Sequence, residues 1–162
     1  MGRAEKRKTP RKRENLENQN KKKRVPLEDG YFLMPDSPDE PPRLLGSYSP
    51  AADRYFWPRR KLCPITSEPV EDRPLSPVGT LYSWTLVRMP WMGSMETAED
   101  GGYGVGQIDL PEGVRVQALI DGQMGDWAIG MPMVFAPRAV STDQDGNELC
   151  TVAFAPLSGE PR

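Results

Sequence analysis

The sequence predicts a mainly β protein whose second half folds as a small five-stranded Greek-key barrel of the OB type. Residues 79–157 contain five short segments of strand composition, separated by turns and loops rich in glycine and proline. No segment has the apolar periodicity of a helix longer than two turns. Many short strands in one stretch of chain favour a closed barrel over an open sheet.

The expected strands follow one another with clear turn signals. Residues 89–102 are expected to form a loop, 111–113 a tight turn, 124–129 one helical turn, and 143–147 a hairpin turn with an Asp-Gly signal. Pro132 and Pro137 indicate edges or bulges in the fourth strand. The five strands are predicted at residues 80–88, 103–110, 114–120, 131–140 and 149–154.

The near-neutral net charge of −2 hides a strong asymmetry. Residues 1–26 carry 11 Lys and Arg against three acids, whereas residues 27–162 have a net charge of −10. The basic segment lacks hydrophobic periodicity and is predicted to be a disordered tail. Such a tail is an arm for nucleic acid or another anionic surface, or it is a solubilising segment. The third reading is that the start codon is misassigned.

Proline and charge divide the remaining chain before the barrel. Residues 27–42 read as a proline-rich linker with an apolar anchor at 31–34, which docks on a partner or on its own domain. Residues 43–78 form a proline-punctuated segment with aromatic and basic side chains, and residues 158–162 a C-terminal tail. With no apolar run of membrane-spanning length and no secretory signal, the protein is predicted to be cytoplasmic.

The residue inventory argues against catalysis by this chain. It has no histidine, which excludes histidine triads, Cys-His pairs and histidine metal sites. Cys63 and Cys150 lack a base, and we interpret Cys63 as a small buried residue. The aspartates at strand ends and turns are predicted to be structural. The glycines of residues 101–106 lack the following helix of a phosphate loop, and within a strand they indicate a bulge or the sharp coiling of a small barrel.

Three segments then resemble a known family whose members join an N-terminal rubredoxin-like zinc ribbon to a C-terminal OB-fold. The segments are LLGSYSPAAD (44–53), WPRRKLCPIT (57–66) and GTLYSWT (79–85), with further similarity at 104–110 and in IGMPMV (129–134). The resemblance covers residues 42–157. Family members accompany thiolases and thiolase-like (sterol-carrier-protein-X type) enzymes that act on acyl-CoA. The resemblance therefore implies a thiolase-fold partner in a hetero-oligomer.

The metal positions of the family pattern are changed in this sequence. They hold Ser49, Ala52, Cys63 and Thr66, and one thiolate cannot hold tetrahedral zinc. The resemblance thus implies a degenerate, metal-free ribbon at residues 43–78, with no zinc expected.

Aromatic and basic residues are the candidate site for acyl-CoA or for the partner. Cations suit the phosphates of coenzyme A, and aromatic rings suit its adenine. The alternative is that the aromatics fill the ribbon core while the cations face solvent. The loop at 89–102, with a tryptophan and three methionines, is the other candidate contact surface. The predicted residues are Tyr55, Trp57, Arg59, Arg60, Lys61, Trp84, Arg88 and Trp91.

Together these observations predict a non-catalytic OB-fold subunit of a thiolase or thiolase-like (aldolase) complex. By resemblance, it stabilises the partner and helps bind an acyl-CoA thioester, the shared ligand, in the degradation of aromatic, steroid or fatty-acid-like compounds. The alternative is a single-stranded nucleic-acid-binding OB-fold protein with a basic N-terminal arm. An acidic folded part argues against that alternative, because nucleic-acid binders usually present a basic face.

Overall fold

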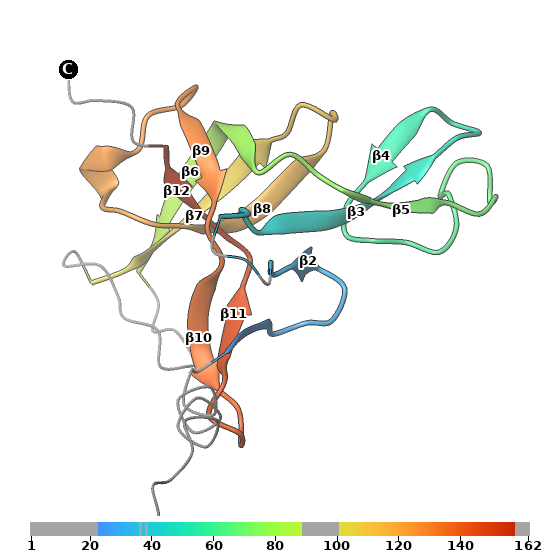
Figure 1. The fold of residues 1–162 in the computed structure, drawn as a ribbon. Coiled ribbons are helices and arrows are strands. Elements are labelled where there is room, and N and C mark those ends of the chain that lie inside the picture. The colour runs from blue at the N-terminus through green and yellow to red at the C-terminus, as the bar shows by residue number, and fades with distance from the viewer. Residues whose placement is uncertain (1–22, 36, 38, 89–100, 158–162) are drawn as a thin grey trace, which may run out of the picture.

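The computed structural model describes residues 23–35, 37, 39–88 and 101–157, and the regular secondary structure of these residues is almost wholly β-strand (Figure 1). Within these residues the helical content is one short 3₁₀ turn, Met124–Asp126, where the sequence predicts a helical turn. The N-terminal half holds β1 (Arg24–Pro26), β2 (Phe32–Leu33), β3 (Arg43–Ser49), β4 (Arg54–Phe56) and β5 (Glu71–Pro74). The second half holds β6 (Val78–Val87), β7 (Tyr103–Asp109), β8 (Arg115–Ile120), β9 (Pro132–Phe135), β10 (Arg138–Thr142), β11 (Glu148–Thr151) and β12 (Ala153–Pro156). No helix among the described residues is long and apolar enough to cross a membrane.

Five strands close into the predicted barrel. Their order around it is β12-β8-β7-β6-β9. β12 closes the barrel by pairing in parallel with β8 and antiparallel with β9, while the other neighbours run antiparallel. A five-stranded closed Greek-key barrel is the OB architecture, so the predicted fold class is confirmed.

The barrel closes tightly because β7 alternates small buried residues with larger outward ones. Gly104 and Gly106 are buried and face the β8 residue Ile120, whose side chain would contact a Cβ at either position. Ile108 continues the inward face with no exposed surface. Glycine therefore allows close packing here, because a Cβ at either position would meet neighbouring side chains.

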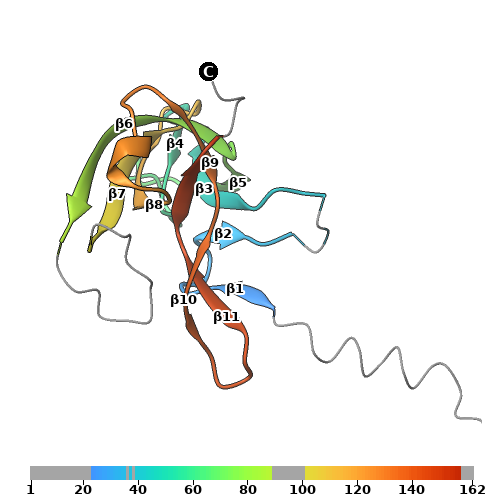
Figure 2. The ribbon, with the colours of Figure 1, turned by 90° about the vertical axis from the view of Figure 1, so that its left-hand side faces the viewer.

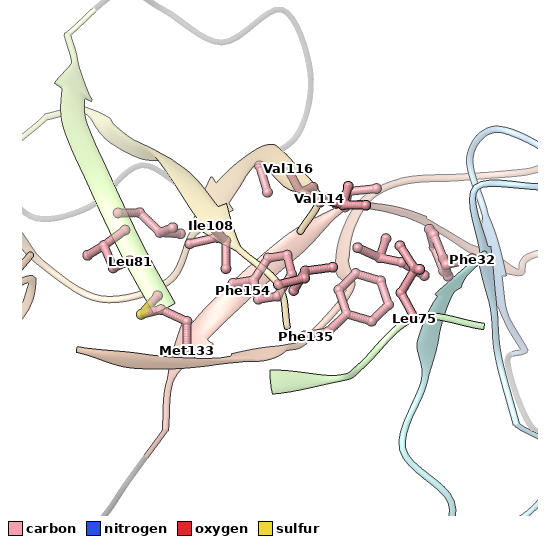
Figure 3. Close-up of a cluster of buried hydrophobic side chains, with 14 of the residues drawn as sticks. Phe32, Leu75, Leu81, Ile108, Val114, Val116, Met133, Phe135 and Phe154 are labelled. Carbon is pink, nitrogen blue, oxygen red and sulfur yellow. The ribbon is translucent and has the colours of Figure 1, made fainter. Parts of the chain in front are cut away.

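The core of the barrel extends into the N-terminal half of the chain. Figure 3 shows Phe154, Phe135, Met133, Leu81 and Ile108 gathered between the strands, with Phe32 and Leu75 at one end. The rings of Phe135 and Phe154 lie 5.4 Å apart. Full burial of side chains of this size contributes roughly 1.5–3 kcal/mol each. Residues from the predicted linker and ribbon thus share one core with the barrel.

Two predicted strands are each divided in the structure. The expected strand at 131–140 splits into β9 and β10, and the one at 149–154 splits into β11 and β12. Pro137 cannot donate a backbone hydrogen bond, and after it the chain leaves the barrel. β10 and β11 then form a hairpin that projects from the barrel (Figure 2), and its turn is the predicted one at residues 143–147.

The predicted disordered tail is too long at its C-terminal end. Residues 24–26 form β1, which pairs in parallel with β11, while the preceding residues 1–22 lie outside the described part of the chain. Glu148 N–H donates to the Lys23 carbonyl over 2.8 Å, and Leu27 N–H donates to the Cys150 carbonyl over 2.7 Å. An open strand edge supplies these partners, and composition alone does not reveal such an edge.

The apolar anchor docks on its own chain. β2 pairs with β3, and the Phe32 ring packs edge-on against Phe135 at 5.5 Å. The carbonyl of Tyr31 accepts hydrogen bonds from Leu45 N–H at 2.9 Å and from the Trp57 indole at 3.3 Å. We call residues 27–34 the strap, because they connect the β10–β11 hairpin to the N-terminal sheet.

The N-terminal sheet forms an arm that extends away from the barrel (Figure 1). β3 lies at its centre and pairs with β2, β4 and β5. Where the arm meets the barrel, Glu112 in the β7–β8 turn accepts hydrogen bonds from Ser76 N–H at 2.7 Å and from its hydroxyl at 2.8 Å. These bonds connect the last residues of the arm to the barrel.

A candidate interface on the barrel face

The outward face of β7 and β8 carries the first part of the candidate site. In OB-folds the face of the second and third barrel strands binds ligands, and β7 and β8 hold those positions. Two depressions lie on this face and adjoin, because both are lined by Tyr103, Val105 and Gln117. The outward position of these side chains follows from the strand alternation that buries the glycines of β7.

The strap forms one side of the first depression. Leu27, Glu28 and Tyr31 line that side, and the depression has a volume of about 370 Å³. The Tyr31 ring meets the Trp57 ring edge-on at 5.5 Å. A hydrogen bond with Glu28, reinforced by burial and by the charge of that carboxylate, raises the pKa of Tyr31. The strap thus supplies an aromatic side to the groove, which we call the strap groove.

Aromatic, apolar and uncharged polar groups dominate both depressions. Glu28 is the charged residue of the strap groove, and the adjoining depression is lined by uncharged residues of β6, β7 and β8. Binding to nucleic acid depends on Lys and Arg side chains that neutralise phosphates. A face of this composition instead suits an apolar protein surface.

The structure divides the predicted site residues into two groups. Trp57 lines the strap groove, and Trp84 is among the residues that line the adjoining depression. Trp84 also packs edge-on against the buried Trp127 at 5.3 Å. Arg88 is exposed at the end of β6, and Trp91 lies outside the described residues.

The remaining predicted residues belong to the arm. Tyr55 packs on Tyr48 with ring centroids 4.8 Å apart. A separate depression, on the arm, is lined by Arg59, Arg60 and Lys61 together with Val70 and Asp72. The Arg59 side chain already has a partner in its own chain, because its guanidinium donates to Asp72 over 2.9 Å.

Sequence reasoning missed Tyr31, Tyr103, Val105 and Gln117 as site residues. Small and large residues alternate along 103–109, and this alternation would have indicated that Tyr103 and Val105 face outward. No comparable signal exists for Tyr31, because only the folded chain brings the strap beside β7.

The aspartates at strand ends and turns form structural contacts. Arg115 donates to both carboxylate oxygens of Asp109, at 2.6 and 2.9 Å. Asp121 forms an ion pair with Arg138 at 3.4 Å, and Asp143 accepts backbone hydrogen bonds within the hairpin turn. Among the residues that the structure describes, no three His, Cys, Asp or Glu side chains gather as a metal site.

The four positions that hold metal in the resembling family do not fit zinc here. Ser49 and Cys63 are buried, and Ala52 N–H donates to the Ser49 hydroxyl over 3.2 Å. Burial raises the pKa of the Cys63 thiol, but hydrogen bonds with the Ser49 and Thr66 side chains and with the Thr66 and Ile65 backbone outweigh this effect and lower the pKa to about 7. These four positions thus offer one sulfur that is surrounded by hydrogen bonds, whereas tetrahedral zinc needs four donor atoms.

This arrangement predicts a pH dependence of stability. Because the pKa of Cys63 falls from its usual 9.0 to about 7 in the folded chain, the unfolded chain binds more protons between these values. The free energy of unfolding should therefore gain a contribution as pH rises from 7 to 9, and lose it as pH falls through 7.

Urea unfolding at pH 6, 7, 8 and 9 measures this contribution as the difference between wild type and Cys63→Ser. The difference should grow with pH, and Thr66→Val, which removes one hydrogen-bond donor, should reduce that growth. A difference that stays constant across the range would contradict the prediction.

Comparison with known proteins finds a family model that matches part of this chain and solved structures that share its fold. Residues 72–136 match the family model described as "ChsH2, C-terminal OB-fold domain". A solved structure described as "Ltp2-ChsH2(DUF35) aldolase" shares the fold with a TM-score of 0.55 at 24% identity, covering 70% of this chain and 84% of that chain. A DUF35-family protein of unknown function from Sulfolobus solfataricus matches more weakly, with a TM-score of 0.42 at 13% identity, over 70% of this chain and 75% of its own. The match bears out the family resemblance for residues 72–136, which are similar to the OB-fold domain of that family.

Proposed function

We propose that this chain is a non-catalytic OB-fold subunit of a hetero-oligomer with a thiolase-fold protein. The partner supplies the chemistry on an acyl-CoA thioester, thiolytic or retro-aldol carbon–carbon cleavage, and this chain stabilises the partner and helps bind the acyl-CoA. The similar solved structure, an aldolase in which ChsH2 is named together with Ltp2, supports a partner of this kind.

The observation that carries the proposal is the character of the OB binding face. Tyr103 and Val105 lie half-buried there, next to the aromatic pair of Tyr31 and Trp57. Half-buried aromatic and aliphatic side chains at the centre of a face are typical of protein–protein contacts. Covering this face with a partner would remove its apolar surface from water.

The acyl-CoA part of the proposal depends on the basic depression of the arm. Arg59, Arg60 and Lys61 offer hydrogen-bond donors and positive charge to phosphate groups. Trp57 precedes them by two residues and offers an aromatic face. We assign Trp57 and Arg59 to coenzyme A contacts at the edge of the partner's active site.

The proposal also includes a ribbon that binds no metal and a complex that is located in the cytoplasm. Both cysteines in the described chain are free and buried, as expected for a reducing compartment. The donor set at positions 49, 52, 63 and 66 supports a ribbon that folds through packing and hydrogen bonds instead of through zinc.

Co-purification from the native host tests the proposed function. The tagged chain is isolated, and the complex is analysed by size exclusion and mass spectrometry. We expect a stoichiometric thiolase-fold protein whose cleavage of acyl-CoA thioesters decreases when this chain is removed. Isolation of the chain alone, or with nucleic acid whose binding weakens steeply with salt, would overturn the proposal and favour the nucleic-acid alternative.

A further inference from the structure

The end of the arm exposes large apolar side chains. Residues 60–66, which we call the ribbon tip, lie in the connection between β4 and β5, and Figure 1 shows this connection reaching the end of the arm farthest from the barrel. Leu62 is 54% exposed and Ile65 is 61% exposed, on either side of the buried Cys63. Neither side chain contributes to the core of the chain.

Unpaired cations lie beside these apolar side chains. The side chains of Arg60 and Lys61 form no ion pair or hydrogen bond with any described residue, although both are exposed. Nearby cations differ, since Arg59 pairs with Asp72 and Arg73 pairs with Glu71 at 2.6 Å. The ribbon tip therefore presents positive charge that its own chain leaves unpaired.

Backbone hydrogen bonds hold the ribbon tip in one conformation. Cys63 N–H donates to the Glu68 carbonyl at 2.8 Å, and Ser67 N–H donates to the Cys63 carbonyl at 2.9 Å. At the start of the tip, Arg60 N–H donates to the buried Ser47 hydroxyl at 2.8 Å, and that hydroxyl donates to the Arg60 carbonyl at 3.1 Å. A preorganised surface loses less conformational entropy when it binds.

The second projection of the molecule provides a contrast. The β10–β11 hairpin ends in the polar residues 143–147, and its described residues expose no large hydrophobic side chain. Projecting from the barrel therefore does not in itself require exposed apolar residues. Their presence at the ribbon tip points to a partner surface.

We propose that the ribbon tip docks into an apolar recess rimmed by carboxylates on the partner subunit. Leu62 and Ile65 enter the recess, while Arg60 and Lys61 pair with the carboxylates. The charge of the tip argues for an acidic rim, since opposite charges at the edge of an interface guide association and select the partner. The proposal rests on the proposed function for the identity of the partner, and it assigns Arg60 and Lys61 to protein contacts.

Measured binding to the thiolase-fold protein identified by co-purification tests the docking proposal. Ile65→Ser should weaken the complex about tenfold, in line with an apolar anchor at an interface. Lys61→Glu should slow association and reduce its dependence on salt. Because both side chains are exposed, the thermal unfolding of either variant alone should match wild type.

Ile129→Ser is the matched control, because Ile129 is 71% exposed and lies between the 3₁₀ turn and the barrel strand β9, not in the strands of the arm. It should leave the affinity unchanged. Wild-type affinity in both tip variants, or an equal loss in the control, would overturn the docking proposal while leaving the proposed function intact. Absence of any complex with wild-type protein would overturn both.

Discussion

Replacing Phe154 with alanine is expected to lower the free energy of unfolding by about 4 kcal/mol, as for other large-to-small changes at fully buried aromatic sites. Phe154 has no exposed surface and lies in β12, the strand that closes the barrel between β8 and β9. Its ring packs against Phe135 (Figure 3). Loss of the ring removes buried apolar surface and leaves a cavity that flanking strands cannot fill without breaking their pairing.

Urea unfolding followed by tryptophan fluorescence measures this change. Because whole domains are stable by only about 5–15 kcal/mol, the variant should unfold at much lower urea. Leu157→Ala is the matched control just after the same strand, since Leu157 is 42% exposed and lies outside the core, and it should change stability by less than about 0.5 kcal/mol. A similar midpoint for Phe154→Ala and wild type would contradict the packing of Phe154 in the barrel core.

Replacing Gly104 with valine is expected to destabilise the chain by about 3 kcal/mol, because it inserts side-chain atoms into a filled space. A Cβ at this position would meet the Trp127 ring, and it would lie 2.6 Å from the Ile120 side chain. The Trp127 ring has little room to move. Its indole N–H donates to the Asp121 carbonyl over 2.9 Å, and its edge contacts Trp84.

Gly125→Ala is the control for this second prediction. Gly125 lies in the 3₁₀ turn, where an added Cβ meets nothing within 4 Å, so its replacement should be nearly neutral. Chemical denaturation of the two variants, compared with wild type at the same pH, gives the difference directly. Equal stability of Gly104→Val and Gly125→Ala would show that β7 does not approach Trp127 as closely as the structure describes.

The strands that the sequence predicts best are those whose pairing partners lie next in the chain. β6, β7 and β8 pair in order, and the expected segments at 80–88, 103–110 and 114–120 agree with them to within a few residues. The segments at 131–140 and 149–154 each read as one strand because their composition is continuous. Each divides because half of it belongs to the barrel and half to the hairpin, and only distant partners decide that division.

The candidate site is predictable only in part, for the same reason. Residue type identifies Trp57 and Trp84, and the structure places them on adjoining depressions. From the sequence, Tyr31 is expected in an apolar anchor and not in the site. Its position beside Trp57 arises only when the strap folds back across the chain. Tyr55 lies in the same aromatic run of the sequence as Trp57, but its ring packs on Tyr48.

The sequence by itself determined the barrel class, the single cysteine among positions 49, 52, 63 and 66, and the absence of histidine. These properties follow from local patterns and from residue types, which do not depend on how the chain folds. The tertiary structure alone decided that β1 and the strap join the folded part, that the strap groove exists, and that Leu62 and Ile65 remain uncovered. Each of these depends on contacts between segments far apart in the chain, and such contacts form where strand edges and apolar faces find partners.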